Sequence, residues 1–508
     1  MILINPPVVK PCEPPPGVAR LAGALKRHNI SHHIIDANLE GLLNLLKAPI
    51  RMEDRWTSRA VRNLNSHLST LRSFKGFENM DRYARAVIDV NRVLEKSVPF
   101  HGVHITLTNY QDQTLSPVRS QDLIRATEVP EMNPFFPYLR KRLLTVLEHK
   151  TPGVVGFSLN YLGQALCTFM MIGMIKKECP GTKVVLGGGL ITSWMNRPGW
   201  VNPFEGLVDA MVSGPGEDAL LSICGLQGCD GDCTPEYEAF SKIDYLAPGF
   251  ILPYSASMGC YWHQCSFCPE TAEGNPYGPV PPEKVIRDMT ALTRDNKPCL
   301  VHFLDNAMSP ALLQKMIERP LNIPWYGFAR ITPHLADPDF CMGLKRSGCV
   351  MLQLGLESGD QDVLSELRKG IDLEQASLAL KNLKRAGIAT YVYLLLGTPA
   401  ETLSRARKTL EFTVQHGHVI DFLNLAIFNM PANGPDAEKF ESADFYEGDL
   451  RLYKSFVHPK GWDRGSVRRF LDKEFKRHPV VAAILRRSPP LFSSNHAPFF
   501  SMASRAKG

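Results

Sequence analysis

Apolar and polar positions follow a strand-then-helix rhythm near the start of the chain. Residues 2–5 form a short apolar run that ends at two prolines, residues 18–28 carry apolar positions at helical spacing, and residues 32–38 return to a strand pattern. This order is typical of the opening of a doubly wound α/β sheet. Residues 40–150 hold helical stretches and little strand signal, so we predict a mostly helical insertion there.

The rhythm resumes after Pro152. Apolar strands are predicted over residues 154–160, 183–189 and 209–214, with helical segments between and after them. Each strand ends in polar or glycine residues, and the carboxyl ends of parallel strands form the ligand crevice of an open α/β sheet. We therefore expect a ligand site there, although tight strand-to-helix turns alone explain the same pattern. The residues concerned are Ser158, Asn160, Tyr161, Gly187, Gly188, Gly189, Gly214, Gly216 and Glu217.

From residue 250 to residue 428 a second series of strands and helices follows. Its strands are near-continuously apolar, which is typical of parallel strands covered by helices. They are predicted at 250–257, 300–306, 325–331, 350–358, 390–397 and 421–428. Polar or turn residues stand at the strand ends, where a βα barrel carries its site. They are Asp305, Asn306, Arg330, Glu357, Ser358, Gly397 and Thr398.

These patterns predict an α/β protein with a Rossmann-like domain, a partial (β/α)6 barrel and a helical tail. The regions are residues 1–235, 236–430 and 431–508. Residues 225–250 are predicted as a linker, in which Cys229 and Cys233 belong to a flexible loop rather than a second metal site. The basic amphipathic stretch 465–487 is predicted as a helical cap, with contact to an anionic substrate or a membrane surface as the alternative.

Composition excludes few classes of function. The 508 residues include 57 basic and 51 acidic side chains, and a net charge of +6 is too mild to argue for nucleic acid. Met1 leads directly into an apolar strand without a basic segment, and no run of about 18 apolar residues occurs, so we expect neither a signal peptide nor a membrane span. A reducing cytoplasm fits the spread of the 12 cysteines.

Three cysteines stand close together after the first strand of the second series. Cys260, Cys265 and Cys268 lie within nine residues, and the two-residue gap between the last two is a common chelating loop. No fourth cysteine or histidine pair completes the set nearby. We therefore interpret the motif as three ligands of an iron–sulfur cubane whose fourth iron is open, rather than as a structural zinc knuckle or incidental cysteines.

On these residues the second half resembles the radical S-adenosylmethionine (SAM) superfamily. The resemblance implies that the three cysteines bind a [4Fe–4S] cluster and that Phe267 lies near the adenine of SAM. Glu357, in LGLESGDQDVL, resembles the family's segment for ribose and methionine, and LLLGTPAET (394–402) resembles a segment near the adenine. SAM contacts are thus implied for Phe267, Asp305, Asn306, Arg330, Glu357, Ser358, Gly397 and Thr398.

Residues 1–430 as a whole resemble the cobalamin-binding branch of this superfamily. The resemblance is carried by the INPP opening, the VVGFSLN strand, the GGG turn and the SGPGED turn. It implies cobalamin contacts at Pro6, Pro7, Gly17, Ser158, Asn160, Tyr161, Gly187, Gly188, Gly189, Gly214, Gly216 and Glu217. The DxHxxG motif of other cobalamin proteins is absent, as in this branch generally, so no histidine is nominated as a cobalt ligand.

The cysteine spacing departs from the family pattern. Four residues, YWHQ, separate Cys260 from Cys265, where the family has three. A longer loop is sterically acceptable because only the thiolates must converge. We expect His263 in this loop to make a hydrogen bond rather than to bind iron. We expect Tyr261 and Trp262 to pack at the cluster edge.

The resemblance implies methylation of an unactivated carbon of a small-molecule or natural-product substrate held between the domains. An adenosyl radical would abstract hydrogen, methylcobalamin would give the methyl group, and a flavodoxin- or ferredoxin-type donor would supply electrons. Cyclisation, rearrangement, peptide modification and metal-dependent binding without catalysis are the alternatives. No Ser/His/Asp or Cys/His constellation nominates a catalytic side chain.

Several of these residues also have a plain structural interpretation. Glu357 suits the N-terminus of a helix, where the macrodipole favours an acid. Arg330 suits a strand-end salt bridge instead of a contact with the SAM carboxylate or the substrate. Asp305 and Asn306 suit helix capping.

Overall fold

The computed structural model describes residues 1–149, 153–226, 228, 233–434, 437–443, 447–490 and 496–501. These residues form two compact units. The first contains the described residues up to Phe250 together with 447–452 and 490, and the second contains the other described residues from Ile251 onward. Cys229, Pro435 and Tyr446, which belong to the linker and the tail in the sequence, lie outside the described residues.

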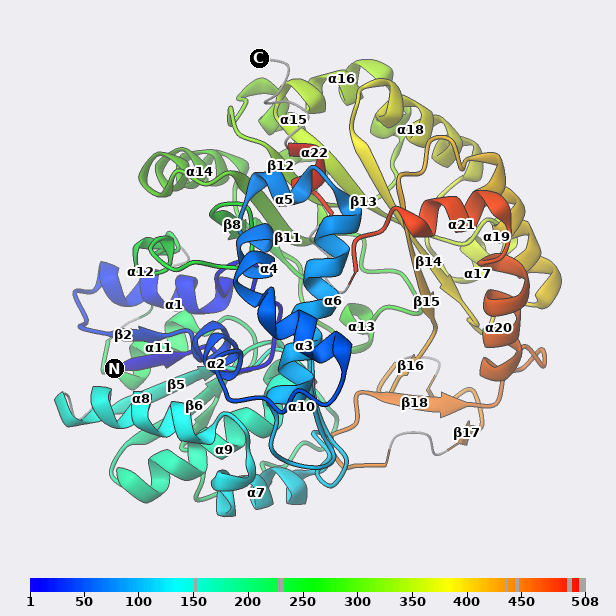
Figure 1. Cartoon of the computed structure of the whole chain (residues 1–508). Helices are drawn as coiled ribbons and strands as arrows, with labels where there is room; N and C mark the ends of the chain where they lie inside the picture. Colours follow the sequence, from blue (N-terminus) through cyan, green and yellow to red (C-terminus); the bar gives the residue numbers. More distant parts are fainter. Residues whose placement is uncertain are drawn as a thin grey trace. The chain divides into compact units, whose positions relative to one another are not determined.

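The first unit is built on a five-stranded parallel sheet in the order β2-β1-β5-β6-β7. The strands are β1 (Ile2–Ile4), β2 (His33–Ile35), β5 (Val154–Ser158), β6 (Lys183–Gly187) and β7 (Ala210–Met211). The chain leaves β1 toward one edge and β5 toward the other, so right-handed crossovers place α1 (Pro16–Arg27) and α9 (Leu162–Glu178) on opposite faces (Figure 1). The expected doubly wound α/β arrangement is confirmed.

Helix α9 shows why its sequence lacks an amphipathic pattern. Residues 164–175 are all buried, because the helix has the sheet on one side and α7 (Ser120–Glu128) and α8 (Phe136–His149) on others. At Gly173 a Cβ would lie 2.2 Å from the carbonyl oxygen of Thr127, so only glycine permits this approach of α7. Two shorter helices, α10 (Gly189–Met195) and α11 (Glu217–Ile223), follow β6 and β7.

The segment between β2 and β5 is mostly helical and also contains one short hairpin. Its further elements are α2 (Ala37–Leu45), α3 (Arg55–Arg62), α4 (Leu64–Leu71), α5 (Phe74–Phe77), α6 (Met80–Ser97), β3 (Val103–Ile105), β4 (Tyr110–Asp112) and a 3-10 turn (Pro130–Met132). Buried Asp89 on α6 holds it together, accepting a hydrogen bond from Trp56 at 2.7 Å and lying 3.1 Å from His67. Helix α12 (Glu238–Ser241) precedes the second unit.

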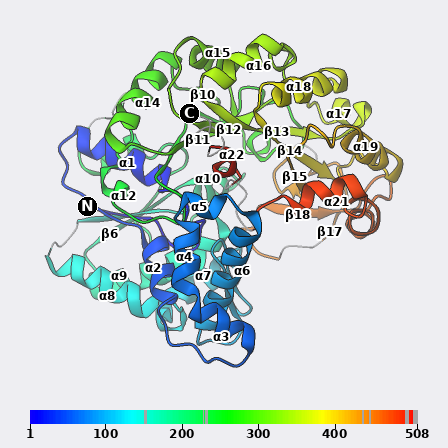
Figure 2. The same cartoon turned by 45° about the horizontal axis from the view of Figure 1, so that its top comes forward.

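The second unit is built on a six-stranded parallel sheet in the order β15-β14-β13-β12-β11-β8. The strands are β8 (Ile251–Tyr254), β11 (Leu300–Met308), β12 (Trp325–Ala329), β13 (Cys349–Glu357), β14 (Ala389–Leu396) and β15 (Phe422–Ile427). Helices follow the outer side of this sheet in an arc (Figure 2). They are α14 (Pro282–Asn296), α15 (Pro310–Glu318), α16 (Pro338–Arg346), α17 (Gln361–Glu366), α18 (Leu373–Arg385) and α19 (Leu403–Gln415).

Most of these helices begin at a side-chain cap that the sequence supplies directly after a strand or loop. Ser309, Asp337, Asp360, Asp372 and Thr402 each accept a hydrogen bond from a backbone amide of the first turn. The six strand-and-helix steps expected from the sequence are therefore present in the expected order. A 3-10 turn (Pro333–Ala336) precedes α16.

The C-terminal part packs on the second unit as short elements. They are β16 (Met430–Pro431), β17 (Ser442–Ala443), β18 (Tyr453–Phe456), α20 (Arg464–Phe470), a π turn (Leu471–Phe475), α21 (Pro479–Arg486) and α22 (Pro498–Ser501). The basic stretch 465–487, predicted as a helical cap, is helical but divided, because Pro479 begins a new helix and cannot continue the old one. Several of its apolar side chains, including Val467 and Val481, are buried, and α21 lies against β15 and α19. Among the described residues no helix has both the length and the apolar character needed to cross a bilayer.

Candidate active site

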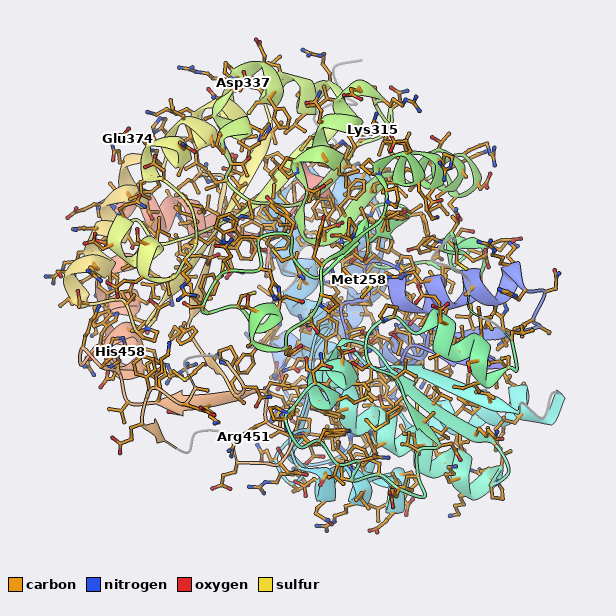
Figure 3. The ribbon with its side chains drawn as sticks, turned by 180° about the vertical axis from the view of Figure 1, so that it is seen from behind. Met258, Lys315, Asp337, Glu374, Arg451 and His458 are labelled. Atoms are coloured by element: carbon orange, nitrogen blue, oxygen red, sulfur yellow. The ribbon has the colours of Figure 1, made fainter. Side chains whose placement is uncertain are left out.

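The cysteine loop begins where β8 ends, at the carboxyl edge of the second sheet. It starts with β9 (Ser257–Met258), which pairs antiparallel with β10 (Gly278–Pro279) and closes the loop at its base. Figure 3 labels Met258 at this position. Gly259 follows with a φ of +67°, and a Cβ there would lie 2.5 Å from the carbonyl oxygen of Pro276. Only glycine fits this turn, which directs the chain into Cys260.

Asp305 and Asn306 hold the start of the loop. The carboxylate of Asp305 accepts hydrogen bonds from the backbone amide of Ala256 at 3.1 Å and from the hydroxyl of Ser257 at 2.5 Å. Asn306 donates to the carbonyl of Gly259 at 3.3 Å. Burial raises the pKa of Asp305, and these hydrogen bonds act in the opposite direction. Both residues contact the cysteine loop rather than capping a helix, and their contact with SAM stays a prediction.

The three cysteine thiols are free, with Cys265 buried and Cys260 and Cys268 half-buried. The amide of Cys268 donates to the carbonyl of Cys265 at 3.3 Å, which forms the tight turn of the two-residue gap. Burial raises the pKa of Cys268 to about 11. Burial also raises the pKa of Cys265, while the charges of Lys369 and Arg330 lower it. Among the described residues no three Cys, His, Asp or Glu side chains are grouped so as to hold a metal ion.

Arg330, at the end of β12, points its guanidinium at the cysteine loop. Its Nη1 lies 4.0 Å from the sulfur of Cys265, and its Nη2 donates to the carbonyl of Lys369. The guanidinium carbon lies 4.2 Å from the ring centroid of Trp262, which is cation–π geometry. Among the described residues these contacts include no carboxylate, so they do not form the strand-end salt bridge that was the alternative for Arg330.

Trp262 joins the loop to the segment after α17. Its Nε1 donates to the carbonyl of Arg368 at 3.0 Å. A Cβ at Gly370 would lie 2.1 Å from the indole, so this ring reaches its place only over a glycine. The amide of Ser266 donates to the carbonyl of Leu367 at 3.1 Å. These contacts fix Trp262 against the segment after α17, and its packing at the edge of a cluster stays a prediction. His263 has a φ of +47°, and its predicted hydrogen bond stays a prediction.

Glu357 ends β13 in a left-handed backbone conformation with a φ of +69°. Its carboxylate accepts a hydrogen bond from Lys369 Nζ at 2.8 Å, and both side chains are almost fully buried. Lys369 Nζ also lies 5.5 Å from the ring centroid of Phe267. Non-glycine residues in this conformation cluster at binding sites, where surrounding contacts hold the strain. Glu357 and Phe267 thus both contact the side chain of Lys369. Their contacts with SAM stay predictions.

Ser358 has a different environment from its neighbour. Its hydroxyl lies 3.1 Å from the hydroxyl of Thr409 on α19 and accepts a hydrogen bond from the amide of Asp360 at 3.1 Å. The side chain is fully buried. These contacts fix the turn between β13 and α17, while the predicted contact of Ser358 with SAM is untested.

The segment 394–402 makes a tight turn around a buried acid, Glu401. Gly397, with a φ of +81°, donates its amide to Glu401 Oε2 at 2.6 Å, and Trp462 Nε1 donates to the same oxygen at 2.8 Å. Burial raises the pKa of Glu401 to about 7. The carbonyl of Thr398 accepts a hydrogen bond from His458 at 2.9 Å, a residue labelled in Figure 3. The sequence indicated the segment but not the individual roles of Glu401, His458 and Trp462.

A small pocket of about 40 Å³ lies beside this turn. Its aromatic, basic and amide side chains come from β18, from the residues just after β15 and from the residues after β18. The lining residues are Gly397, Ile427, Phe428, Asn429, Lys454, Ser455, Phe456, His458, Trp462, Asp463 and Arg464. Phe428 also belongs to a buried apolar cluster, and both Phe267 and Phe456 pack against this cluster. The predicted adenine side of the site therefore has an apolar wall and an adjoining pocket.

In the first unit, strand order reverses between β1 and β5, which is where doubly wound sheets bind ligands. Asn160, just after β5, donates to the hydroxyl of Ser158 at 3.0 Å and accepts from the amide of Gly189 at 2.9 Å. Gly188 has a φ of +110°, and a Cβ there would lie 2.5 Å from the carbonyl oxygen of Leu159. A Cβ at Gly17 would lie 3.2 Å from the hydroxyl of Ser158. Turns distant in sequence therefore meet at this edge.

Gln164 ties the same edge to the loop after β1, and sequence reasoning missed it. Its side chain donates to the carbonyl of Pro6 at 2.8 Å and accepts from the amides of Asn160 and Tyr161. Tyr161 itself is 56% exposed, so its ring is available to a ligand. Gln164 lies within an apolar helical run, and only its polarity among buried neighbours signalled a special role.

The SGPGED turn has a mainly structural set of contacts. Gly214, with a φ of +73°, donates its amide to the hydroxyl of Thr192 at 2.9 Å. Glu217 is buried in an ion pair with Arg20 on α1 at 2.5 Å. This pair joins α11 to α1. Contacts of Gly214, Gly216 and Glu217 with cobalamin stay predictions, as do those of Pro7 and Gly187.

Residues 254–413 match the model of the radical SAM superfamily. They are a radical SAM domain. The chain is 24% identical over 261 residues to an uncharacterised methyltransferase of Pyrococcus horikoshii, covering 46% of this chain and 53% of that protein. It is 23% identical over 338 residues to the anaerobic magnesium-protoporphyrin IX monomethyl ester cyclase of Rubrivivax gelatinosus, covering 55% of this chain and 60% of that protein. The chain therefore spans between half and two thirds of these relatives.

The fold is also similar to a solved structure over nearly all of the chain. This is TsrM from Kitasatospora setae, a radical SAM methyltransferase with cobalamin and a [4Fe–4S] cluster bound. The TM-score is 0.56 at 14% identity, covering 97% of this chain and 91% of TsrM. At this identity the likeness is one of fold, and it covers the Rossmann-like unit as well as the radical SAM domain.

The residues of the radical SAM domain fit an iron–sulfur cluster. Three free thiols share one loop, a guanidinium faces the most buried of them, and a glycine turn and the side chains of Asp305 and Asn306 fix the start of the loop. Thiolates are the usual ligands of such clusters. In the first unit, glycine turns let a large ligand approach the backbone at the strand-order reversal.

Proposed function

We propose that this chain is a cobalamin-dependent radical SAM enzyme that methylates an unactivated carbon of a small-molecule or natural-product substrate. The observation that carries the proposal is the cysteine loop. Three free thiols follow the first strand of a parallel sheet within a radical SAM domain, and a buried guanidinium lies 4.0 Å from one of them. When bound, the cluster and SAM supply one-electron cleavage chemistry, and cobalamin supplies a methyl group.

The protein's own residues hold and orient these groups. Cys260, Cys265 and Cys268 are the cluster ligands of the proposal. Phe267, packed against a buried apolar cluster, forms a wall of the adenine site. The turn around Gly397 and Thr398 is fixed by Glu401 and presents its backbone. Burial of these groups excludes water from reactive species.

Cobalamin is assigned to the crevice between β1 and β5. Ser158, Asn160, Gly188 and Gly189 already share one hydrogen-bonded turn system there, and the ring of Tyr161 is exposed at its rim. The glycines leave no side chains between a ligand and the backbone.

The proposal also includes an electron donor of the flavodoxin or ferredoxin type. It places the enzyme in the cytoplasm, whose reducing environment keeps an open cluster intact.

Cyclisation is the second candidate, because one relative is named as a cyclase. The two reactions are distinguished by the product. Methyl transfer adds the mass of one CH2 group to the substrate and consumes SAM as a methyl source, whereas ring closure does not. Mass spectrometry of the product with methyl-labelled SAM separates them.

The proposal is tested by anaerobic reconstitution of the full chain. The wild type should bind about four irons per chain and form 5′-deoxyadenosine with SAM under reduction. Cys265→Ala should lose most of the iron and all SAM cleavage. Cys341→Ala is the matched control, because Cys341 is also free and fully buried in this unit but donates only to the carbonyl of Leu335. Intact iron content and SAM cleavage in Cys265→Ala would show that the proposal is wrong.

A further inference from the structure

Arg330 is a buried charge whose partners do not neutralise it. Its side chain is almost fully buried at the end of β12. Within the described part of the chain its partners are the sulfur of Cys265, the carbonyl of Lys369 and the face of Trp262, and none of these is a carboxylate. A buried charge without a counter-charge is costly, so the site needs a negative group that the apoprotein does not provide.

Among the described residues, the positive charge of the neighbouring Lys369, unlike that of Arg330, is neutralised by a carboxylate. Lys369 Nζ pairs with Glu357 at 2.8 Å in a buried ion pair, so these two charges compensate each other. What Lys369 gives to Arg330 is its carbonyl oxygen, a neutral acceptor. Arg330 therefore carries the uncompensated positive charge next to the cysteine loop, and its Nη1 faces Cys265 at 4.0 Å.

The four-residue spacing in the cysteine loop provides the clamp that fixes this charge. Trp262 belongs to the YWHQ stretch, covers the guanidinium at 4.2 Å and is itself held by the carbonyl of Arg368. Gly370 leaves room for the indole, since a Cβ there would lie 2.1 Å from it. The guanidinium is thus held from one face and from one edge. Its remaining edge is directed at the cysteine sulfur.

We propose that Arg330 is a fixed cation that raises the reduction potential of the cluster bound by Cys265. This inference rests on the proposed function. Reduction transfers one electron from an external reductant to the cluster, from the [4Fe–4S]2+ to the [4Fe–4S]+ state, and no bond is formed or broken. The added negative charge is stabilised by a nearby cation more than the oxidised state is, because a low-dielectric surrounding screens the interaction weakly. Interactions at the cluster sulfurs are a known determinant of potential.

The test is a redox titration of the reconstituted full chain without SAM, followed by electron paramagnetic resonance of the reduced cluster. Arg330→Met removes the charge at similar length, and at a fixed solution potential its ratio of reduced to oxidised cluster should fall at least tenfold. That fall is a midpoint lower by about 59 mV or more for a one-electron couple. Arg330→Lys keeps the charge and should recover most of the ratio. Arg294→Met is the control, because Arg294 is exposed and pairs with Asp295.

Trp262→Leu gives a second, independent variant. It leaves the charge of Arg330 in place but removes the ring that holds the guanidinium, so the ratio should fall by a smaller factor. If Arg330→Met binds too little iron for titration, the midpoint of Trp262→Leu tests the inference in its place. Unchanged midpoints in iron-loaded Arg330→Met or Trp262→Leu would overturn the inference and leave the proposed function standing. A wild type that forms no four-iron cluster would instead overturn the proposed function, and this inference with it.

Discussion

Glu401 is an acid that the fold keeps away from water. One of its oxygens accepts from Gly397 and Trp462, and the side chain is almost fully buried. Its other oxygen has no hydrogen-bond partner among the described residues. Because burial disfavours the charged form more than these two donors favour it, the pKa of Glu401 is raised from 4.5 to about 7.

This raised pKa predicts a stability that falls between weakly acidic and neutral pH. A carboxyl with a higher pKa in the folded state than in the unfolded state stabilises the fold fully below about pH 4.5, and this contribution is lost as pH rises to about 7. The loss amounts to about 3 kcal/mol at most. Glu401→Gln keeps the acceptor oxygen and should remove the loss, giving a higher urea midpoint than the wild type at pH 8 but not at pH 5.

Glu374→Gln on α18 is the control for this measurement. Glu374 is exposed and labelled in Figure 3, so its replacement should leave the pH dependence of the wild type unchanged. Parallel pH profiles for wild type and Glu401→Gln would contradict the raised pKa of Glu401.

Residues differ in how much of their role the sequence carries. Cys260, Cys265 and Cys268 could be predicted as a group because their spacing is local. The pair of Glu357 and Lys369 could not, because it forms only when the chain folds back after α17, and no period or motif marks a lysine twelve residues away. Arg330 lies beside the cysteine loop, but its partners there, the sulfur of Cys265 and the indole of Trp262, belong to a segment about 65 residues earlier in the chain, so no local pattern marks them.

At the scale of elements, apolar runs and helical spacing located the main strands and helices of both units. The six strands of the second sheet lie where continuous apolar runs predicted them, since both of their faces are covered. Short pairings such as β9 with β10 carry no such run. They arise from the closing of a loop, which leaves no apolar period in the sequence.

The contact between the cysteine loop and the segment after α17 predicts a strong effect of Gly370→Ala. Gly370 has a φ of +65°, and the new Cβ would lie 2.1 Å from Trp262. The backbone strain alone costs about 1–2 kcal/mol, and the clash must also displace the indole. We expect a lower melting temperature, lower iron content after reconstitution and altered tryptophan fluorescence.

Gly274→Ala separates strain from steric displacement. Gly274 has a similar φ of +67°, but no atom lies within 4 Å of the position that a Cβ would take there. Gly274→Ala should therefore lower the melting temperature through backbone strain but leave the iron content unchanged. Equal iron content in both variants would refute a role of the Trp262 contact in shaping the loop.

At the scale of the whole molecule, two parallel α/β sheets place a candidate site at the carboxyl ends of their strands. The cysteines and their surrounding charges belong to the second unit, and the strand-order reversal between β1 and β5 belongs to the first. Each candidate site is built from residues of its own unit. Loading of the cluster and binding of cobalamin should therefore be separable by mutation.

Two variants test this separation in the full chain. Cys265→Ala should lose the cluster and still bind cobalamin, because it changes nothing in the first unit. Tyr161→Ala should weaken cobalamin binding about tenfold, since truncating an aromatic contact typically costs more than 1 kcal/mol, and should leave iron content unchanged. Tyr161 is 56% exposed, so folding should be little affected. Iron analysis and equilibrium dialysis with cobalamin measure the two sites in the same samples. Loss of both groups in either variant would mean that the sites depend on each other, and unchanged cobalamin binding in Tyr161→Ala would remove that residue from the crevice.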